Sequence, residues 1–193
     1  LDYNIFRNCA FLGNSTFDGL YKYGIITTGK FFTRVGLNIN TIYTTPTATG
    51  SVPIIDELYG GSYEGVLVML GQNECGWPNL DVFINKYAQL LNDIWVRQPG
   101  CKIFIVGLPP VSKAVSDKGD NGVTNAHINY INNGLKQLAS STANVCYVPV
   151  PSSFYGSDGA LPADASSDGI HLNIAYSRVW ADQICATVTS VLG

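Results

Sequence analysis

Residues 9–19 read CAFLGNSTFDG, and this stretch passes from a buried strand into the start of a helix. The run from Cys9 to Gly13 is short and apolar and ends at a glycine, which is typical of a strand buried in a parallel sheet. The segment from Phe17 to Lys30 then has helical spacing. The junction therefore predicts a strand followed directly by a helix, the repeating unit of an α/β fold.

The same alternation continues along the chain. Four further apolar runs are predicted to be strands: Thr33 to Gly36, Val66 to Leu70, Lys102 to Gly107 and Val145 to Val148. Helical spacing recurs at Ile54 to Tyr59, Leu80 to Arg97, Asn125 to Ala139 and Ile174 to Val191. We expect a single domain over residues 1–193, an α/β fold built as a three-layer α/β/α sandwich on a five-stranded parallel sheet, flavodoxin-like in its winding. The functional site of such a fold lies beyond the carboxyl ends of the strands.

Composition excludes some classes of function. The 193 residues carry a net charge of -3 and contain no basic tract, so we expect no nucleic-acid partner. Apolar runs such as Val66 to Leu70 are far too short for a membrane span. Charged residues make up only 13% of the chain, against about 25% in ordinary soluble domains, and Asn, Ser, Thr and Tyr must supply the surface polarity. This composition favours a secreted or cell-envelope location over the cytoplasm.

The five cysteines are widely scattered. They form no Cys-x-x-Cys pair and no zinc-site spacing with histidine, so the sequence predicts no metal. Cys101 and Cys146 each open a predicted strand, and a disulfide between them is geometrically possible if those strands are neighbours. The cysteines are Cys9, Cys75, Cys101, Cys146 and Cys185.

Ser15 lies at the turn between the first predicted strand and its helix. Such a turn gives a nucleophile access to substrate, and the helix N-terminus offers unpaired N–H groups to an oxyanion. The alternative is that Ser15 caps the helix, with Asp18 as the partner in a capping box. Asn14-Ser15-Thr16 is also a glycosylation sequon, but a glycan there would cover the proposed nucleophile, so we discount it.

A serine nucleophile needs a base, and the chain has two histidines. Asp168 precedes His171 by three residues, so both side chains can face one side of a helical turn and the carboxylate can orient the imidazole. The alternative is that Asp168 caps the last helix beside a surface histidine. His127 has only asparagines near it, and we interpret it as a solvated helix residue.

Two further candidates follow the neighbouring predicted strands. The side chain of Asn73 follows the third strand and the backbone N–H of Gly36 ends the second, and both can donate to an oxyanion, although Asn and Gly are also routine turn residues. Trp77 comes just after Asn73 and can stack on a sugar ring or pack in the core. Residues 110–125 are long and polar enough to form a mobile loop beside the site.

Four of these segments resemble, in order and over nearly the whole chain, the four sequence blocks of the SGNH (GDSL-like) hydrolase family. They are Gly13-Asn14-Ser15, Gly36, Gly71-Gln72-Asn73-Glu74 and Asp168-Gly169-Ile170-His171. The resemblance implies that Ser15 is the nucleophile, His171 the general base and Asp168 its orienting carboxylate. It also implies an oxyanion hole formed by the N–H groups of Ser15 and Gly36 and the side chain of Asn73. The sequence departs from the family pattern in having Asn14 and Glu74 where that pattern has aspartates.

These features predict a serine esterase that needs no cofactor and acts on small-molecule or carbohydrate esters with a short acyl group, acetyl above all. Three alternatives remain open. The first is a flavodoxin-like cofactor-binding module, the second a non-catalytic carbohydrate-binding or scaffolding domain, and the third a lysophospholipase or thioesterase of the same family. The sequence leaves the oligomeric state open.

Overall fold

Five parallel strands form one sheet in the computed structural model, which describes all 193 residues. The strands are β1 (Cys9–Gly13), β2 (Lys30–Thr33), β3 (Gly65–Met69), β4 (Lys102–Val106) and β5 (Val145–Val148). Their order in the sheet is β2-β1-β3-β4-β5, so the chain winds outward from β1 to one edge and then crosses back to build the other side. This confirms the predicted doubly wound sheet with five parallel strands.

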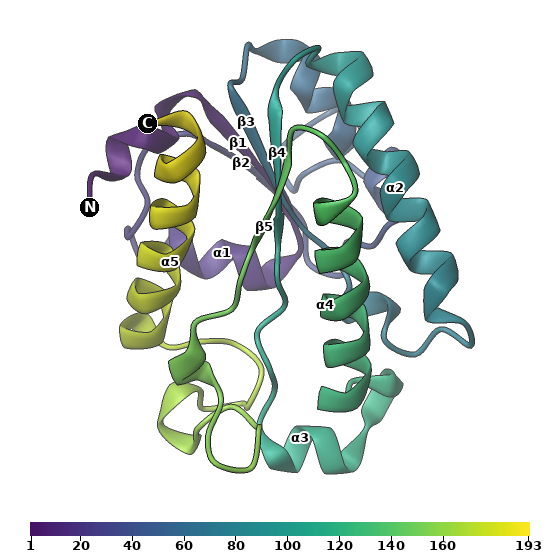
Figure 1. Cartoon of the computed structure of the whole chain (residues 1–193), viewed down its shortest axis with the longest axis vertical. Helices are drawn as coiled ribbons and strands as arrows, with labels where there is room; N and C mark the ends of the chain where they lie inside the picture. The colour runs from purple at the N-terminus through teal and green to yellow at the C-terminus, as the bar shows by residue number, and fades with distance from the viewer.

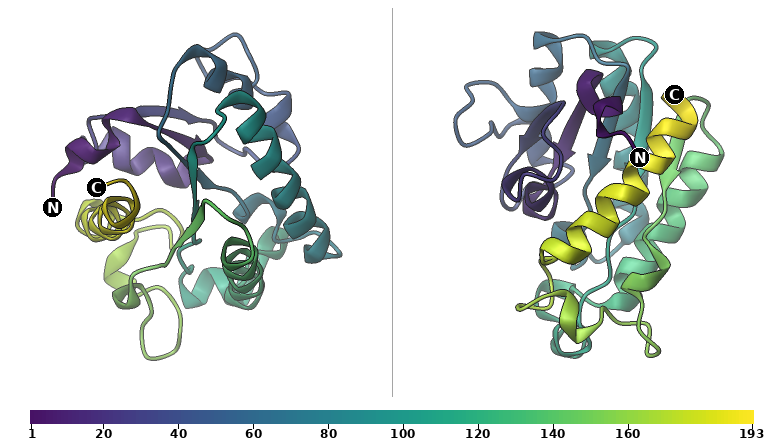
Figure 2. Two further views of the ribbon diagram at one scale, coloured as in Figure 1. Left: turned by 45° about the horizontal axis from the view of Figure 1, so that its top comes forward. Right: turned by 90° about the vertical axis from the view of Figure 1, so that its left-hand side faces the viewer.

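Helices cover both faces of the sheet (Figures 1 and 2), with α1 and α5 packed together on one face and α2 and α4 on the other. The α-helices are α1 (Ser15–Lys22), α2 (Leu80–Arg97), α3 (Lys113–Lys118), α4 (Asn125–Ser140) and α5 (Ile174–Leu192). Short 3-10 helices occupy Tyr3–Asn8, Thr41–Tyr43, Ile54–Gly60, Gln72–Glu74, Asp120–Gly122, Ser152–Phe154 and Ala163–Ala165. No helix combines the length and the apolar character needed to cross a bilayer.

The hydrophobic core lies between these layers as one cluster of 46 buried residues. Every residue of β1 and β3 is buried, because these central strands have helices over both faces, and this explains their unbroken apolar sequences. In α2 the buried residues recur at three- and four-residue steps, which places one apolar face on the sheet. They are Phe83, Tyr87, Leu90, Leu91 and Ile94.

The second strand lies earlier in the sequence than predicted. The strand spans Lys30–Thr33, whereas Thr33 to Gly36 was expected, and α1 ends at Lys22 and not at Lys30. The helix stops because Gly24 has φ +67 and its N–H bonds back to the carbonyl of Tyr21, a left-handed helix end that favours glycine. The chain then has room to return along β1, where Ala10 lies opposite Lys30.

The segment predicted to be a loop, residues 110–125, contains the short helix α3. Ser112 caps this helix by accepting a hydrogen bond from the N–H of Val115 at 3.2 Å. In Figure 1, α3 and the loop that follows β5 lie together at the lower end of the molecule. The N–H of Leu161 donates to the carbonyl of Val111 at 3.0 Å, and this bond joins the loop after β5 to the segment that precedes α3.

The possible disulfide between Cys101 and Cys146 is absent, and all five cysteines are free thiols. The strands β4 and β5 are neighbours as that possibility required. However, Phe104 and not Cys101 lies opposite Cys146, because Cys101 precedes the first residue of β4. The register therefore separates the two sulfur atoms along the strands.

The reversal of winding direction decides where functional groups can gather. The chain leaves β1 in one direction and β3 in the other, so the turns after these adjacent strands leave a crevice at their carboxyl ends. Ser15 lies two residues after β1, and Asn73 lies four residues after β3. The fold thus places both predicted residues beside the point where ligands bind in sheets of this kind.

Candidate active site

Ser15 is the first residue of α1, and the preceding Asn14 caps the helix. Asn14 Oδ1 accepts a hydrogen bond from the N–H of Thr16 at 3.0 Å. Asp18 accepts from the hydroxyl of Thr33 and forms an ion pair with Lys22, so it makes no capping box. The capping interpretation of Ser15 was therefore wrong, because the cap lies one residue earlier and leaves the serine hydroxyl available.

Close packing holds this turn in place. A Cβ atom on Gly13 would come within 2.8 Å of both the carbonyl oxygen of Met69 and the ring of Phe17, so only glycine fits where β1 meets α1. Asn14 is 2% exposed, and its Nδ2 donates to Oε1 of Gln72 at 2.5 Å. A side chain held in this way cannot take a glycan in the folded protein, which agrees with our discounting of the sequon.

The single side-chain hydrogen bond of Ser15 joins it to His171. Ser15 Oγ lies 3.3 Å from His171 Nε2, although the two residues are 156 positions apart in the sequence. The other ring nitrogen, Nδ1, lies 2.7 Å from Asp168 Oδ2. The structure therefore brings the three predicted residues into one chain of hydrogen bonds, from hydroxyl to imidazole to carboxylate.

Asp168 and His171 meet through a turn and not through a helix. Asp168 Oδ1 accepts from the N–H groups of Ile170 and His171, both at 2.8 Å, and this folds the chain back so that Oδ2 reaches the imidazole. The last helix, α5, is capped by Asn173. The prediction that Asp168 and His171 share a helical turn was therefore wrong, and so was the alternative in which Asp168 caps the last helix.

The carboxyl group of Asp168 is held in its ionised form. Burial alone would raise its pKa, but the hydrogen bonds from His171, from two backbone N–H groups and from the Ser166 hydroxyl outweigh this effect and lower the pKa well below its usual value. The side chains of His171 and Asp168 are 51% and 52% exposed. The pair is therefore open to solvent, and as an exposed ion pair it contributes little to stability.

Asn73 follows β3 and lines the same hollow as Ser15 and His171. Gly71, with φ +140, makes the turn after β3 possible, and a Cβ atom there would meet Leu108 at 2.7 Å. One N–H of the Asn73 amide donates to the carbonyl of Leu37 at 2.9 Å. An amide nitrogen carries two N–H groups, so the second remains able to donate to a substrate oxygen.

The next residue, Glu74, is fully buried, and sequence reasoning assigned it no role. Its Oε2 accepts from the N–H of Ile39 at 2.9 Å, while Oε1 has no partner. Burial raises the pKa of this carboxyl to about 8, so the neutral form is favoured inside the protein. Glu74 and Asn73 together tie the turn after β3 to the segment that contains Leu37 and Ile39.

Two hollows flank the paired side chains of Ser15 and His171. One, of about 400 Å³, is lined by Asn14, Asn73 and a set of loop residues that the sequence had marked only as the edge of the site. The other, of about 250 Å³, extends along α1 past Asp18 and Lys22. The loop residues of the first hollow are Val111, Asn121 and Val123, and Ile170 completes its apolar side.

Two predicted residues lie apart from these hollows. Gly36 is exposed, has φ +78 and sits in a turn three residues after β2, and it lines neither hollow. Trp77 is half-buried against the core with its ring edge-on to Phe83, 6.4 Å between centroids. His127 is exposed on α4, and its Nδ1 lies 2.6 Å from the carbonyl oxygen of Gly122. No three of the His, Cys, Asp and Glu side chains are close enough together to hold a metal ion.

Solved structures with this fold come from several hydrolases. A Streptococcus pneumonia protein named for platelet activating factor superposes with a TM-score of 0.78 at 20% identity, over 94% of this chain and 83% of that one. A carbohydrate esterase of family 3 from Talaromyces cellulolyticus gives a TM-score of 0.65 at 17% identity, over 95% and 97%. A GDSL-like lipase from Bacteroides thetaiotaomicron gives 0.64 at 13% identity, over 95% and 88%. At such identities the likeness establishes the fold.

Sequence comparison supplies the family. A search of curated protein sequences found no match. The model of the GDSL-like Lipase/Acylhydrolase family matches residues 35–179, a range that includes Gly36, Asn73, Asp168 and His171 and begins after Ser15. This match extends over much more than half of the 193 residues. The chain therefore belongs to the GDSL-like Lipase/Acylhydrolase family.

Proposed function

We propose that this protein is a serine esterase that hydrolyses carboxylic esters through an acyl-enzyme on Ser15. The observation that carries the proposal is the hydrogen-bonded series of Ser15 Oγ, His171 and Asp168, with separations of 3.3 and 2.7 Å. A hydroxyl, an imidazole and a carboxylate in this order are the groups that nucleophilic acyl transfer requires. Asp168 is ionised, as an orienting carboxylate must be.

The proposed reaction proceeds in two halves. Ser15 Oγ attacks the ester carbonyl carbon while His171 Nε2 takes the hydroxyl proton, and the carbonyl oxygen becomes an oxyanion. His171 then gives that proton to the departing alcohol, which leaves the acyl group on Ser15. Water attacks the acyl-enzyme while His171 takes its proton, and His171 returns that proton to Ser15 Oγ as the bond to the acyl group breaks and the carboxylic acid departs. Asp168 keeps the imidazole in the required tautomer throughout.

The oxyanion is assigned to donors beside Ser15. Asn73 lines the hollow that contains Ser15 and His171, and its second N–H is available. The N–H of Ser15 is one of the first in α1, where helix N–H groups lack intrahelical partners. We propose Gly36 as a third donor only on the resemblance of its segment to the family pattern, since it lines neither hollow.

A short acyl group fits the site better than a fatty acid. The hollows at Ser15 measure about 400 and 250 Å³, and most of the residues around them are polar. A long acyl chain needs an extended apolar channel, whereas Val111, Val123 and Ile170 offer only a small apolar wall. We therefore propose acetyl or similarly short esters, with a carbohydrate as the alcohol. A carbohydrate esterase is among the solved structures of this fold.

The decisive experiment compares the natural protein with Ser15→Ala on a panel of esters. The panel contains p-nitrophenyl esters of increasing chain length, acetylated sugars and a lysophospholipid. We expect hydrolysis of the acetyl esters by the natural protein and a loss of about 10³-fold or more in Ser15→Ala, with an unchanged circular dichroism spectrum. A fluorophosphonate should label the natural protein at Ser15 alone.

Other outcomes separate the alternatives. Full activity of Ser15→Ala would remove the proposed nucleophile. Faster turnover of long-chain esters or of the lysophospholipid would replace the short-acyl proposal by a lipase or thioesterase. Yellow protein with no fluorophosphonate labelling would indicate a flavin-binding module, and colourless protein that binds acetylated sugars without hydrolysing them would indicate a carbohydrate-binding domain.

A further inference from the structure

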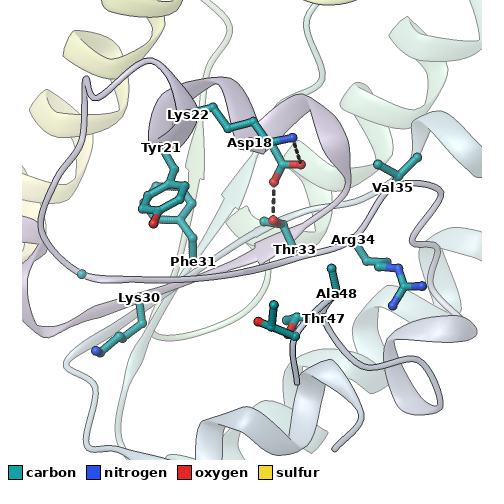
Figure 3. A pocket seen from close by; sticks show the side chains of 12 residues that line it. Asp18, Tyr21, Lys22, Lys30, Phe31, Thr33, Arg34, Val35, Thr47 and Ala48 are labelled. Atoms are coloured by element: carbon teal, nitrogen blue, oxygen red, sulfur yellow. Dashed lines mark hydrogen bonds and ion pairs between the residues drawn. The ribbon is translucent and has the colours of Figure 1, made fainter. Parts of the chain in front are cut away.

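A larger cavity, of about 610 Å³, opens next to the proposed active site (Figure 3). We call it the α1–β2 groove, because residues of α1 and β2 line it, among them Tyr21, Lys22, Lys30 and Phe31. Arg34, Val35 and residues 47–49 complete the lining. The groove shares Asp18 and Lys22 with the hollow that contains Ser15 and His171. The two cavities therefore adjoin at Asp18 and Lys22, between the nucleophile and the edge of the sheet.

Together the two adjoining cavities extend further along α1 than a simple ester needs. Ser15, Asp18 and Lys22 are spaced by three and four residues, so they lie along one face of α1. At 1.5 Å per residue, Lys22 lies about 10 Å from Ser15 along the helix. A short oligosaccharide can extend over that distance, whereas the acetyl ester of a small alcohol cannot.

An exposed aromatic ring forms one wall of the groove. Tyr21 is 62% exposed, and its ring lies 5.6 Å from that of Phe31 with a tilt of 34°. Phe31 in turn stacks on the buried Phe11, 4.1 Å between centroids and 5° between planes. This column of rings fixes Tyr21, as Figure 3 shows for Tyr21 and Phe31. A rigid, amphipathic ring provides a contact surface for a sugar at a low cost in conformational entropy.

The groove also carries positive charge in a chain whose net charge is -3. Its one carboxylate, Asp18, is already balanced by Lys22 at 3.3 Å and by the hydroxyl of Thr33. Lys30 and Arg34 form no ion pair. Arg34 donates one hydrogen bond to the carbonyl of Pro46 at 2.9 Å, and its side chain is one of those that line the groove. Cations that are not paired with carboxylates favour anionic ligands.

From this combination we propose that the α1–β2 groove binds the carboxylate-bearing residues of an acidic oligosaccharide, such as uronic acids, while an acylated residue of the same chain lies at Ser15. Tyr21 stacks on a sugar ring, and Lys30 and Arg34 bind carboxylates. The hydroxyl groups of Thr47 and Thr49 in the opposite wall can exchange hydrogen bonds with sugar hydroxyls. The proposal deepens the esterase proposal, and it rests on that function only for the acylated residue.

The test measures binding on protein that cannot turn over. Ser15→Ala is titrated with trigalacturonate and, separately, with the neutral cellotriose, and backbone amide shifts are followed by NMR. We expect trigalacturonate to shift the amides of Lys30, Phe31 and Arg34 and to bind more weakly as salt is added. Lys30→Gln or Arg34→Gln in the same background should weaken this binding by about tenfold, the loss of one hydrogen bond to a charged group. Tyr21→Ala should weaken it too.

A matched control is Lys86→Gln, which removes the same charge from an exposed position on α2, across the sheet. It should leave trigalacturonate binding unchanged. The proposal is overturned if trigalacturonate does not bind, if Lys86→Gln weakens binding as much as Lys30→Gln, or if cellotriose binds equally well. Binding to phosphatidylglycerol vesicles without binding to trigalacturonate would also overturn it in favour of a lipid surface. Because no turnover is involved, a failure here is separable from a failure of the esterase assay.

Discussion

Oε2 of Glu74 accepts a hydrogen bond from the N–H of Ile39 at 2.9 Å, so a fully buried carboxyl group joins the turn after β3 to the segment after β2. The residue next to Glu74, Asn73, bonds to the carbonyl of Leu37 in that same segment. The two bonds fix the proposed oxyanion donor, Asn73, relative to the segment after β2. The ionisation of Glu74 therefore bears on both stability and the shape of the site.

Glu74 should make the protein less stable as the pH rises. Burial raises its pKa in the folded protein to about 8, above the ordinary value of 4.5 that it has when the chain unfolds. The neutral carboxyl thus contributes its full stability below about pH 4.5, and this contribution is lost as the pH rises through about 8. Between these limits the free energy of unfolding should fall by up to about 1.4 kcal/mol per pH unit. Urea unfolding at pH 5, 6, 7 and 8 measures this slope.

The comparison for this prediction is Glu74→Gln, which keeps the shape of the side chain and cannot ionise. Its amide would leave a buried N–H without a partner, so the variant should be less stable at pH 5 but should lose this component of the pH dependence. Glu57→Gln removes a half-buried carboxyl outside the site, and this variant should retain the pH dependence that Glu74 causes. Equal pH slopes for the natural protein and Glu74→Gln would show that Glu74 is ionised in the folded state.

Replacing Asp168 by asparagine should damage catalysis far more than stability. The amide would retain an oxygen for the backbone N–H groups of Ile170 and His171, so the turn should persist. It would lose the negative charge beside His171 Nδ1, which the lowered pKa of Asp168 keeps in place even in mildly acidic solution. By analogy with the same change in serine proteases, kcat on p-nitrophenyl acetate should fall by about 10⁴-fold.

The matched control for Asp168→Asn is Asp164→Asn, a change in the same connection before α5. Asp164 Oδ1 accepts only from the hydroxyl of Tyr176, at 3.1 Å. This control should keep its activity within about twofold, because most surface substitutions away from such features change stability by no more than about 0.5 kcal/mol. A loss in Asp168→Asn no larger than in the control would reject Asp168 as the orienting carboxylate.

Asn14→Asp, which restores the residue type of the family pattern, should be tolerated. The new carboxylate can still accept from the N–H of Thr16, and it lies at a helix N-terminus, where a negative charge is favourable by about 0.3–1 kcal/mol. Gln72 needs only to rotate its amide so that Nε2 donates where Oε1 now accepts. The free energy of unfolding should therefore stay within about 1 kcal/mol, as chemical denaturation would show.

Asn14→Leu provides the contrast, because it removes both hydrogen bonds. The loss of the helix cap alone should lower the free energy of unfolding of Asn14→Leu by about 1–2 kcal/mol. Equal stability of Asn14→Asp and Asn14→Leu would mean that the bonds to Thr16 and Gln72 do not hold this turn.

Sequence reasoning was most accurate where burial is complete. The unbroken apolar runs of β1 and β3 and the periodic face of α2 each reflect contact with a core, and their predicted positions match within a residue. The edge strand β2 is only half-buried and lacks a clear pattern, so Lys30 was assigned to the preceding helix, and Phe31 and Phe32 were assigned to no element. Helix α3 was missed because it is short and buries none of its residues.

In the site, too, some features were predictable from the sequence and others were not. Chemistry identified Ser15, Asp168 and His171 as candidates, since few side chains can serve as nucleophile, base and orienting carboxylate, and the fold brings their polar atoms together. The contacts that hold the turns of the site in place were not predictable. The bond between Asn14 and Gln72 and the burial of Glu74 depend on contacts across 58 and 35 positions, which no local pattern encodes.

Asn73→Ala should lower kcat on p-nitrophenyl acetate by about 10²- to 10³-fold and change KM little, because an oxyanion donor acts mainly in the transition state. Asn73 also donates to the carbonyl of Leu37, so part of any loss can come from a displaced segment. That part is separable, because losing the bond to Leu37 should lower the free energy of unfolding by about 1 kcal/mol, whereas losing the oxyanion donor should not affect unfolding. Asn73→Asp removes both donors and repels the oxyanion, and it should reduce kcat at least as much. A decrease below threefold in Asn73→Ala would place the oxyanion donors elsewhere, with the backbone N–H of Ser15 as the first to consider.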